Sequence, residues 1–216
     1  MEPLHVTARL LTAIALPGGP LALDALLAAA VCRRDDIPPP PPVRPIEIPV
    51  EREPGGRFHL ATFSLGAAAR YDHRWVNRRF PIEIAQTPLG SLRIRRVHIS
   101  GGPAKSYRIP LETIHLEARR LDWYAVGERR EIEELLAISR YIGKRRAVGL
   151  GRVERWEVEP CEPWPGFPLV RDGRALRPLP PDWPGLVEPV MEYRTISYPY
   201  WDATARVLCA VPEGVC

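Results

Sequence analysis

The chain alternates apolar stretches with breaks of glycine, proline or charge, and this pattern predicts both strands and helices. Residues 4–16 (LHVTARLLTAIAL) are apolar or β-branched and stop at Pro17-Gly18-Gly19-Pro20, which predicts a strand followed by a turn. In residues 21–34 (LALDALLAAAVCRR), Leu23, Leu26, Leu27, Ala30 and Val31 share one helical face, so we expect the first helix there. The run Pro38 to Pro42 cannot continue that helix and predicts an exposed connector.

The rest of the chain predicts three more strands and one more helix. Strands are expected over Arg57–Leu65, Ile114–Val126 and Gly151–Pro160, where apolar and polar residues alternate. A second helix is expected over residues 128–143 (ERREIEELLAISRYIG), because its apolar residues recur with helical spacing between two glycines. Residues 161–189 are rich in proline and lack periodicity, so they predict an irregular arm, and residues 191–211 predict a last strand or hairpin.

This order of elements predicts the fold class. Strand, helix, strand, insertion, strand, helix and strand together are the βαββαβ plan of a ferredoxin-like (RRM-like) fold. We therefore expect an α+β protein with a ferredoxin-like domain over residues 1–160, an insertion at about residues 66–110, and a proline-rich C-terminal arm over residues 161–216 that packs on the domain. A ferredoxin-like fold hosts many activities, so the fold alone does not decide the function.

Composition excludes several classes of protein. A hydrophobic content of 45% and a charged content of 26% in 216 residues argue against wholesale disorder. No run of 18 apolar residues is free of charge, so neither a membrane span nor a signal peptide is predicted. The four cysteines lack the paired spacing of a zinc site or a disulfide framework. We therefore expect a reduced, cytoplasmic protein that binds no membrane and carries no cofactor or metal.

The basic residues are unevenly distributed. The net charge is only +4, yet 28 of the 30 basic residues are arginine, which suits bidentate phosphate contacts; a GC-rich coding sequence would give the same excess. The insertion carries nine basic residues between Ala67 and Arg108 against two acids. Its rings alternate with arginines, a combination typical of single-stranded RNA recognition. The candidate RNA-binding residues of the insertion are Arg70, Tyr71, His73, Arg74, Trp75, Arg78, Arg79, Arg95, Arg96, Lys105 and Arg108.

A second basic segment lies between the second predicted helix and the strand at Gly151–Pro160. This glycine-rich loop, GKRRAVGLG, has neither the spacing nor the position of a Walker loop or a dinucleotide fingerprint. Its glycines would let the backbone approach a phosphate beside free amide donors and cationic side chains. A helix C-cap glycine followed by basic residues and a turn would explain the same letters. The candidate RNA-binding residues of the loop are Gly143, Lys144, Arg145, Arg146, Gly149 and Gly151.

Two stretches together resemble a known family. The opening LHVTARLLTAIALPGGPLALDALLAAAV and the later YIGKRRAVGLGRVERWEV are similar to the repeat-associated RNA-binding (RAMP) superfamily of CRISPR systems. Within it, the chain looks most like the subunit of type IV effector complexes that caps the 5′ handle of the guide RNA. The resemblance covers residues 1–35 and 105–160, and it leaves out the basic insertion and the C-terminal arm.

The resemblance implies a non-catalytic subunit that holds the 5′ handle of the CRISPR RNA. Its implied partners are the backbone subunits and the large subunit of the effector complex, and a contact with target DNA stays open. The family loop maps onto the glycine-rich loop. Family members also project a thumb-like hairpin that intercalates between guide nucleotides, and residues 66–110 occupy the corresponding place in this chain.

Two other functions remain open at this point. Related RAMP subunits cleave the repeat RNA with a histidine, and His73 and His98 are the plausible candidates here, although no partner residue is fixed by spacing. A scaffold that binds only protein is the other alternative. The acids Asp24 and Asp122 have no partner that the sequence reveals, so they are assigned no role.

Overall fold

The computed structural model of the protein describes residues 1–16, 19–37, 46–78 and 107–212. Its centre is an antiparallel sheet in the order β4-β1-β5, formed by β1 (Glu2–Leu10), β4 (Arg120–Gly127) and β5 (Val153–Pro160). The middle strand pairs along its length with both neighbours, from Glu2 opposite Gly127 on one side and from Leu4 opposite Pro160 on the other. The protein is therefore of the α+β class, with antiparallel strands and few helices in the described ranges.

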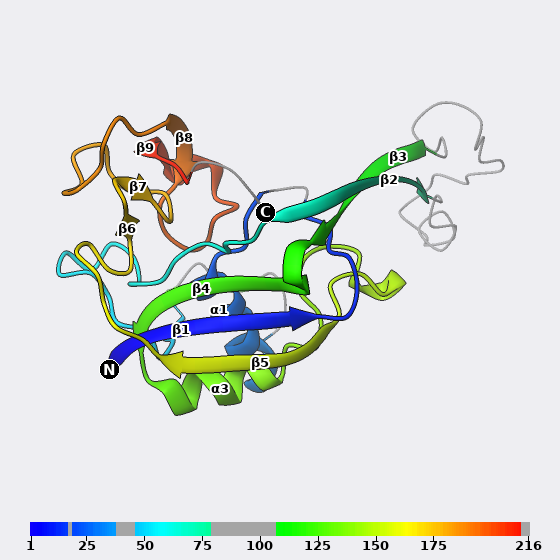
Figure 1. The fold of residues 1–216 in the computed structure, drawn as a ribbon, viewed down its shortest axis with the longest axis horizontal. Helices are drawn as coiled ribbons and strands as arrows, with labels where there is room; N and C mark the ends of the chain where they lie inside the picture. The colour runs from blue at the N-terminus through cyan, green and yellow to red at the C-terminus, as the bar shows by residue number, and fades with distance from the viewer. Residues whose placement is uncertain (17–18, 38–45, 79–106, 213–216) are drawn as a thin grey trace, which may run out of the picture.

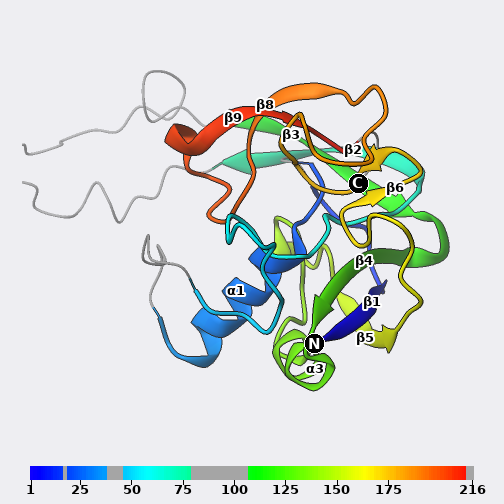
Figure 2. The same cartoon turned by 90° about the vertical axis from the view of Figure 1, so that its left-hand side faces the viewer.

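Two helices cover one face of this sheet (Figure 2). These are α1 (Leu23–Arg34) and α3 (Arg129–Ala137), which contact each other, and α3 also contacts β5. Alternate residues of each strand point toward the helices because side chains switch faces along a strand. Leu4 and Val6 of β1 and Trp123 of β4 are accordingly fully buried in the main core. The opposite face of the sheet carries the polar members of the same strands, including His5, Thr7 and Asp122.

A long hairpin projects from the sheet domain (Figure 1). It consists of β2 (Ala68–Arg78) and β3 (Tyr107–Leu116), which pair antiparallel from Ala68 opposite Leu116 to Arg78 opposite Tyr107. The single strand predicted over Ile114–Val126 is therefore wrong. The chain turns at Glu117–Arg119, where Ala118 and Arg119 have positive φ, so β3 belongs to the hairpin and β4 to the sheet.

The strand predicted over Arg57–Leu65 is also absent as a regular strand. Its residues instead form isolated bridges with several partners: Ala61 with Ala125 and Leu65 with Asp122 of β4, and Phe63 with Ala22 at the start of α1. The segment runs beside β4 but changes partner every few residues, so no continuous ladder develops. Two other elements are shorter than predicted.

The strand expected over residues 4–16 ends at Leu10, and Ile14 further on bridges to Ile114 of β3. The helix expected over residues 128–143 ends at Ala137. There the chain leaves the helix because Tyr141 bridges to Arg152 and the amide of Ile142 bonds the carbonyl of Gly151. Tertiary pairing thus overrides a helical pattern that continues in the sequence.

The residues after β5 form two small hairpins above the sheet domain (Figure 1). The first pairs β6 (Val170–Arg171) with β7 (Arg174–Ala175). The second pairs β8 (Met191–Thr195) with β9 (Arg206–Ala210), and a short 3-10 turn at Ala203–Ala205 lies between these two strands, directly before β9. Of the strand or hairpin predicted over residues 191–211, the structure has the hairpin. A separate apolar cluster, which includes Phe58, Leu169 and Leu179, joins these hairpins to the segment beside β4.

In the described part of the chain, no helix has the length and apolar character that a bilayer span requires.

Candidate nucleic-acid interface

The glycine-rich loop lies between α3 and β5, where the sequence predicts it, and it includes a short 3-10 turn at Arg146–Val148. Two of its glycines are required by packing. A Cβ on Gly151 would lie 1.9 Å from the carbonyl oxygen of Ile142, and one on Gly143 would lie 2.8 Å from the carbonyl oxygen of Ala15. Both glycines also have positive φ. Their presence is therefore explained by the close contact of the loop with the preceding chain, independently of any ligand.

Gly149 differs from the other two glycines. It is exposed, with a φ of 85°, and a Cβ built on it would meet nothing within 4 Å. Several backbone amides of the loop are already engaged: those of Lys144 and Gly151 donate to the carbonyls of residues 15 and 13, and that of Gly149 donates to Arg146. The expectation of free amide donors along the loop is therefore wrong at these positions. Side chains, more than backbone amides, give this loop its capacity to bind an anion.

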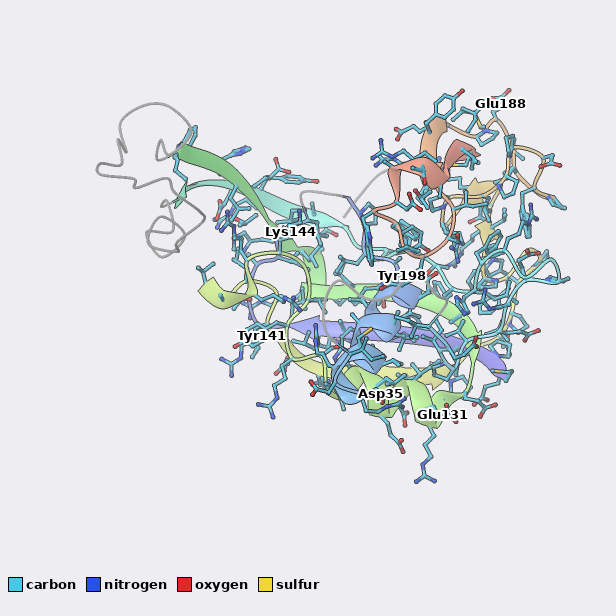
Figure 3. The ribbon with its side chains drawn as sticks, turned by 180° about the vertical axis from the view of Figure 1, so that it is seen from behind. Asp35, Glu131, Tyr141, Lys144, Glu188 and Tyr198 are labelled. Carbon is cyan, nitrogen blue, oxygen red and sulfur yellow. The ribbon has the colours of Figure 1, made fainter. Side chains whose placement is uncertain are left out.

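Three adjacent cations extend from the loop into solvent. Lys144, Arg145 and Arg146 are all exposed, and within the described residues none of them has an acidic partner. Figure 3 places Lys144 on the side of the molecule from which the β2–β3 hairpin projects. Arg145 also has positive φ, so the backbone turns sharply between the cations. Unpaired surface cations on a tightly held loop suit contacts with phosphate groups.

One face of the hairpin carries exposed rings. Tyr71, His73 and Trp75 alternate along β2, so they share a face, and 50% of Tyr71 and 66% of Trp75 are exposed. The residues opposite His73 and Trp75 on β3 are Glu112 and Pro110. Exposed rings along one strand are surfaces on which unpaired bases can stack. The RNA-binding role expected of these residues stays a prediction.

The other face of the hairpin carries a local ion-pair network at its base. Arg70 Nη2 donates to Asp72 Oδ2 at 2.9 Å, and His115 Nε2 lies 3.0 Å from the same oxygen. Although partial desolvation acts against it, the hydrogen bond with His115 and the charge of Arg70 hold the pKa of Asp72 below its usual range. Arg70 is thus exposed but already paired, so Asp72 partly neutralises its charge.

The structure brings the loop and the hairpin together. Leu150 of the loop, Leu111 of β3 and Ala15 form a small buried cluster. Nearby, Ile14 exchanges two backbone hydrogen bonds with Ile114 of β3. The base of the hairpin and the cationic loop are therefore fixed to one another, although some 30 to 80 residues separate their sequences.

The other predicted residues of the insertion are placed only in part. Arg74 and Arg78 lie in β2, and Arg108 lies in β3. The remaining candidates lie outside the described residues: Arg79, Arg95, Arg96, Lys105 and the histidine His98.

Sequence reasoning missed a polar network on the helix-free face of the sheet. Asp122 Oδ1 accepts a hydrogen bond from the Thr7 hydroxyl at 2.7 Å and lies 2.9 Å from His5 Nε2, and Arg120 pairs with Oδ2 at 2.8 Å. Burial raises the pKa of Asp122, but these three partners outweigh it and hold the pKa below its usual range. Only the register of β1 against β4 brings Thr7 opposite Asp122, so the sequence alone could not reveal it.

Among the described residues, no group of three histidine, cysteine, aspartate or glutamate side chains is arranged so that it could hold a metal ion.

The sequence was compared with known protein families. The model of the family "CRISPR type IV associated protein Csf3" matches residues 64–212, well over half of the 216 residues. The matched range includes the hairpin, the glycine-rich loop and the C-terminal arm up to residue 212. The family match covers the insertion and most of the arm, which the sequence resemblance leaves out, but it does not cover residues 1–35, where part of that resemblance lies. No curated protein matches the sequence.

Proposed function

The chain belongs to the family of CRISPR type IV associated protein Csf3, and we propose that it is the RNA-binding subunit of a type IV effector complex. In this proposal it caps and clamps the 5′ handle of the CRISPR RNA without cleaving it. Its sheet domain is a ferredoxin-like RAMP domain, and it abuts the backbone subunits and the large subunit of the complex. A contact with target DNA is compatible with the same position.

One observation carries the proposal. The cluster of Ala15, Leu111 and Leu150 fixes an exposed cationic loop, which has no acidic partner among the described residues, beside the base of a hairpin that carries exposed rings. Cations that hold phosphates and rings that stack on bases are the two components of single-stranded RNA binding. Rigid attachment of one to the other allows a single strand to contact both.

The test removes charge from the loop and from a matched helix. Arg145→Ala with Arg146→Ala removes two exposed, unpaired arginines, whereas Arg129→Ala with Arg130→Ala removes two exposed arginines of α3 that pair with Glu133 and Glu134. The loop variant is expected to lose guide RNA from the purified complex, and its RNA affinity should depend less steeply on salt, by about 0.7 in the logarithmic slope for each lost phosphate contact. Equal RNA retention by both variants, with both folded, contradicts the proposal.

The two alternatives have direct tests. A repeat-processing endoribonuclease would cleave labelled repeat RNA, and cleavage lost on His73→Ala or His98→Ala would establish that function. Within the described residues His73 is exposed on β2 and faces Glu112 across the hairpin. A scaffold that binds only protein would contact no nucleic acid within its purified complex. Crosslinking tests this, because such a scaffold would form no crosslink between the chain and RNA.

A further inference from the structure

A cavity of about 310 Å³ lies between the glycine-rich loop and α1. It is lined by residues 15–16 and 19–21, by Leu26, Ala29 and Arg33 of α1, and by residues between 139 and 146. Its volume is at the lower end of the range of small-molecule sites, about 300 to 1,000 Å³. Figure 3 labels two of the residues that line the cavity, Tyr141, which lies just before the glycine-rich loop, and Lys144, which lies within it.

The cavity has an apolar part and a cationic part. Leu21, Leu26 and Ala29 contribute apolar surface, and Arg33, Lys144 and Arg146 contribute positive charge. No acidic side chain belongs to the lining among the residues that the structure describes. The cavity therefore has an apolar surface that suits an apolar group and cationic side chains that can bind an anion.

Arg33 and Arg146 place two positive charges at the cavity, and no acidic side chain in its described lining compensates them. Arg33 comes from the last turn of α1 and donates a hydrogen bond to the neutral Ser139 hydroxyl, with 3.4 Å between Nη1 and Oγ. Partial desolvation, and after it the charge of Arg146, lowers the pKa of the Arg33 guanidinium. Two like charges at one cavity repel each other in the free protein, and an anion bound between them would relieve that repulsion.

We propose that this cavity binds one nucleotide of the RNA, with its base against Leu21, Leu26 and Ala29 and its phosphate held by Arg33, Lys144 and Arg146. The inference rests on the proposed function and adds a defined nucleotide site to it. A nucleotide fits better than inorganic phosphate alone because the apolar half of the cavity would otherwise remain unfilled. Arg33 is the residue that the sequence did not indicate, because it belongs to the first helix and lies far from the loop in the chain.

The first experiment uses the isolated full chain and AMP as the probe. AMP should bind saturably, as followed by NMR titration, and more tightly than either adenosine or inorganic phosphate, each of which offers half of the ligand. Arg33→Gln should weaken AMP binding about ten-fold or more, since it removes a charge-assisted contact. Arg34→Gln is the matched control, because Arg34 is exposed, lies outside the cavity and pairs with Asp35 at 2.7 Å. Equal weakening by both variants, or no saturable AMP binding, overturns the inference.

A second variant tests the apolar half. Ala29 is half-buried and lines the cavity, so Ala29→Phe should fill the space for the base and abolish the advantage of AMP over phosphate. Unchanged AMP binding by this variant also overturns the inference. The two proposals fail separately. If handle RNA binds and depends on Arg145 and Arg146 while AMP does not bind, only the cavity is wrongly assigned. If AMP binds while guide RNA does not, the cavity is a nucleotide site, but the RNA-clamping function is wrong and the nucleotide does not come from the guide RNA.

Discussion

The Tyr200 hydroxyl hydrogen-bonds both carboxylate oxygens of Asp24, at 2.8 and 3.0 Å, although 176 residues separate the two in the sequence. The same hydroxyl accepts a hydrogen bond from Arg177 Nη2 at 2.8 Å, and Arg177 lies 3.6 Å from Asp24. Burial raises the pKa of Tyr200 well above its ordinary value, so the hydroxyl stays protonated and continues to donate. This buried network ties the C-terminal arm to the first turn of α1.

Tyr200→Phe should destabilise the protein by about 1 to 3 kcal/mol, because it leaves a buried carboxylate and a buried guanidinium short of a partner. Asp24 is 2% exposed and Arg177 is fully buried, so water cannot replace the lost hydroxyl. Equilibrium unfolding in urea measures the effect. Tyr193→Phe is the matched control, since Tyr193 is 71% exposed and its hydroxyl should contribute less than about 0.5 kcal/mol. Similar losses for both variants would contradict the role of the network.

Two glycines of the same loop should respond differently to the same substitution. Gly151→Ala places a Cβ 1.9 Å from the carbonyl oxygen of Ile142, which the chain can accommodate only by moving the loop away from residues 13–15. Gly149→Ala meets nothing within 4 Å and pays only for an alanine at positive φ, about 1 to 2 kcal/mol. We expect a larger loss of thermal stability for Gly151→Ala. If Gly149→Ala is the more damaging, the loop packs differently from the structure described.

Elements that local pattern determines were predictable. The helix over residues 21–34 follows from helical spacing and is confirmed as α1. The apolar and aromatic content of residues 191–211 predicts a strand or hairpin, and the structure has the β8–β9 hairpin there. The break between β3 and β4 was not predictable, because it depends on Ala118 and Arg119 adopting positive φ, a conformation that neither residue favours. The turn there divides the segment predicted as one strand between two sheets.

The candidate site likewise has some residues that the sequence reveals and others that only the folded structure brings together. The cationic loop was visible in the sequence because its residues are consecutive. Arg33 was not visible, since only the packing of α1 beside the loop brings it to the same cavity as Lys144 and Arg146. The buried partners of Asp24 and Asp122 likewise come from distant segments, so no spacing rule could have assigned them.

Trp75→Ala should weaken RNA binding with little effect on stability. Trp75 is 66% exposed on the hairpin, so its removal costs little packing, whereas each stacked base contributes about 1 to 3 kcal/mol to binding. Fluorescence anisotropy with labelled guide RNA measures the affinity. The matched control is Trp201→Ala, because Trp201 is 60% exposed but belongs to the C-terminal arm. An equal loss of affinity in both variants would place the stacking surface elsewhere.

His59 should make the folded state less stable in mild acid. Burial lowers the pKa of His59 from 6.5 to about 4; Arg52 and Arg177 act in the same direction, and Asp24 and Glu47 act against it. The folded protein therefore keeps His59 neutral at a pH where the unfolded chain binds a proton. The stability that this provides is complete above pH 6.5 and is lost as the pH falls from 6.5 toward 4, by about 1.4 kcal/mol per pH unit at most.

The interval between pH 6.5 and about 5 isolates this histidine from the carboxylates, whose unfolded pKa values lie near 4. Asp72 and Asp122, which partners hold below their usual pKa, add a further loss only at more acidic pH. Urea unfolding at several pH values should show stability falling by about 2 kcal/mol across the interval, and His59→Gln should flatten the fall. His73→Gln, at an exposed position, should leave it unchanged. Because His59→Gln also alters packing, NMR titration of the wild-type ring provides a second measurement, and a ring that titrates near pH 6.5 in the folded protein would refute the mechanism.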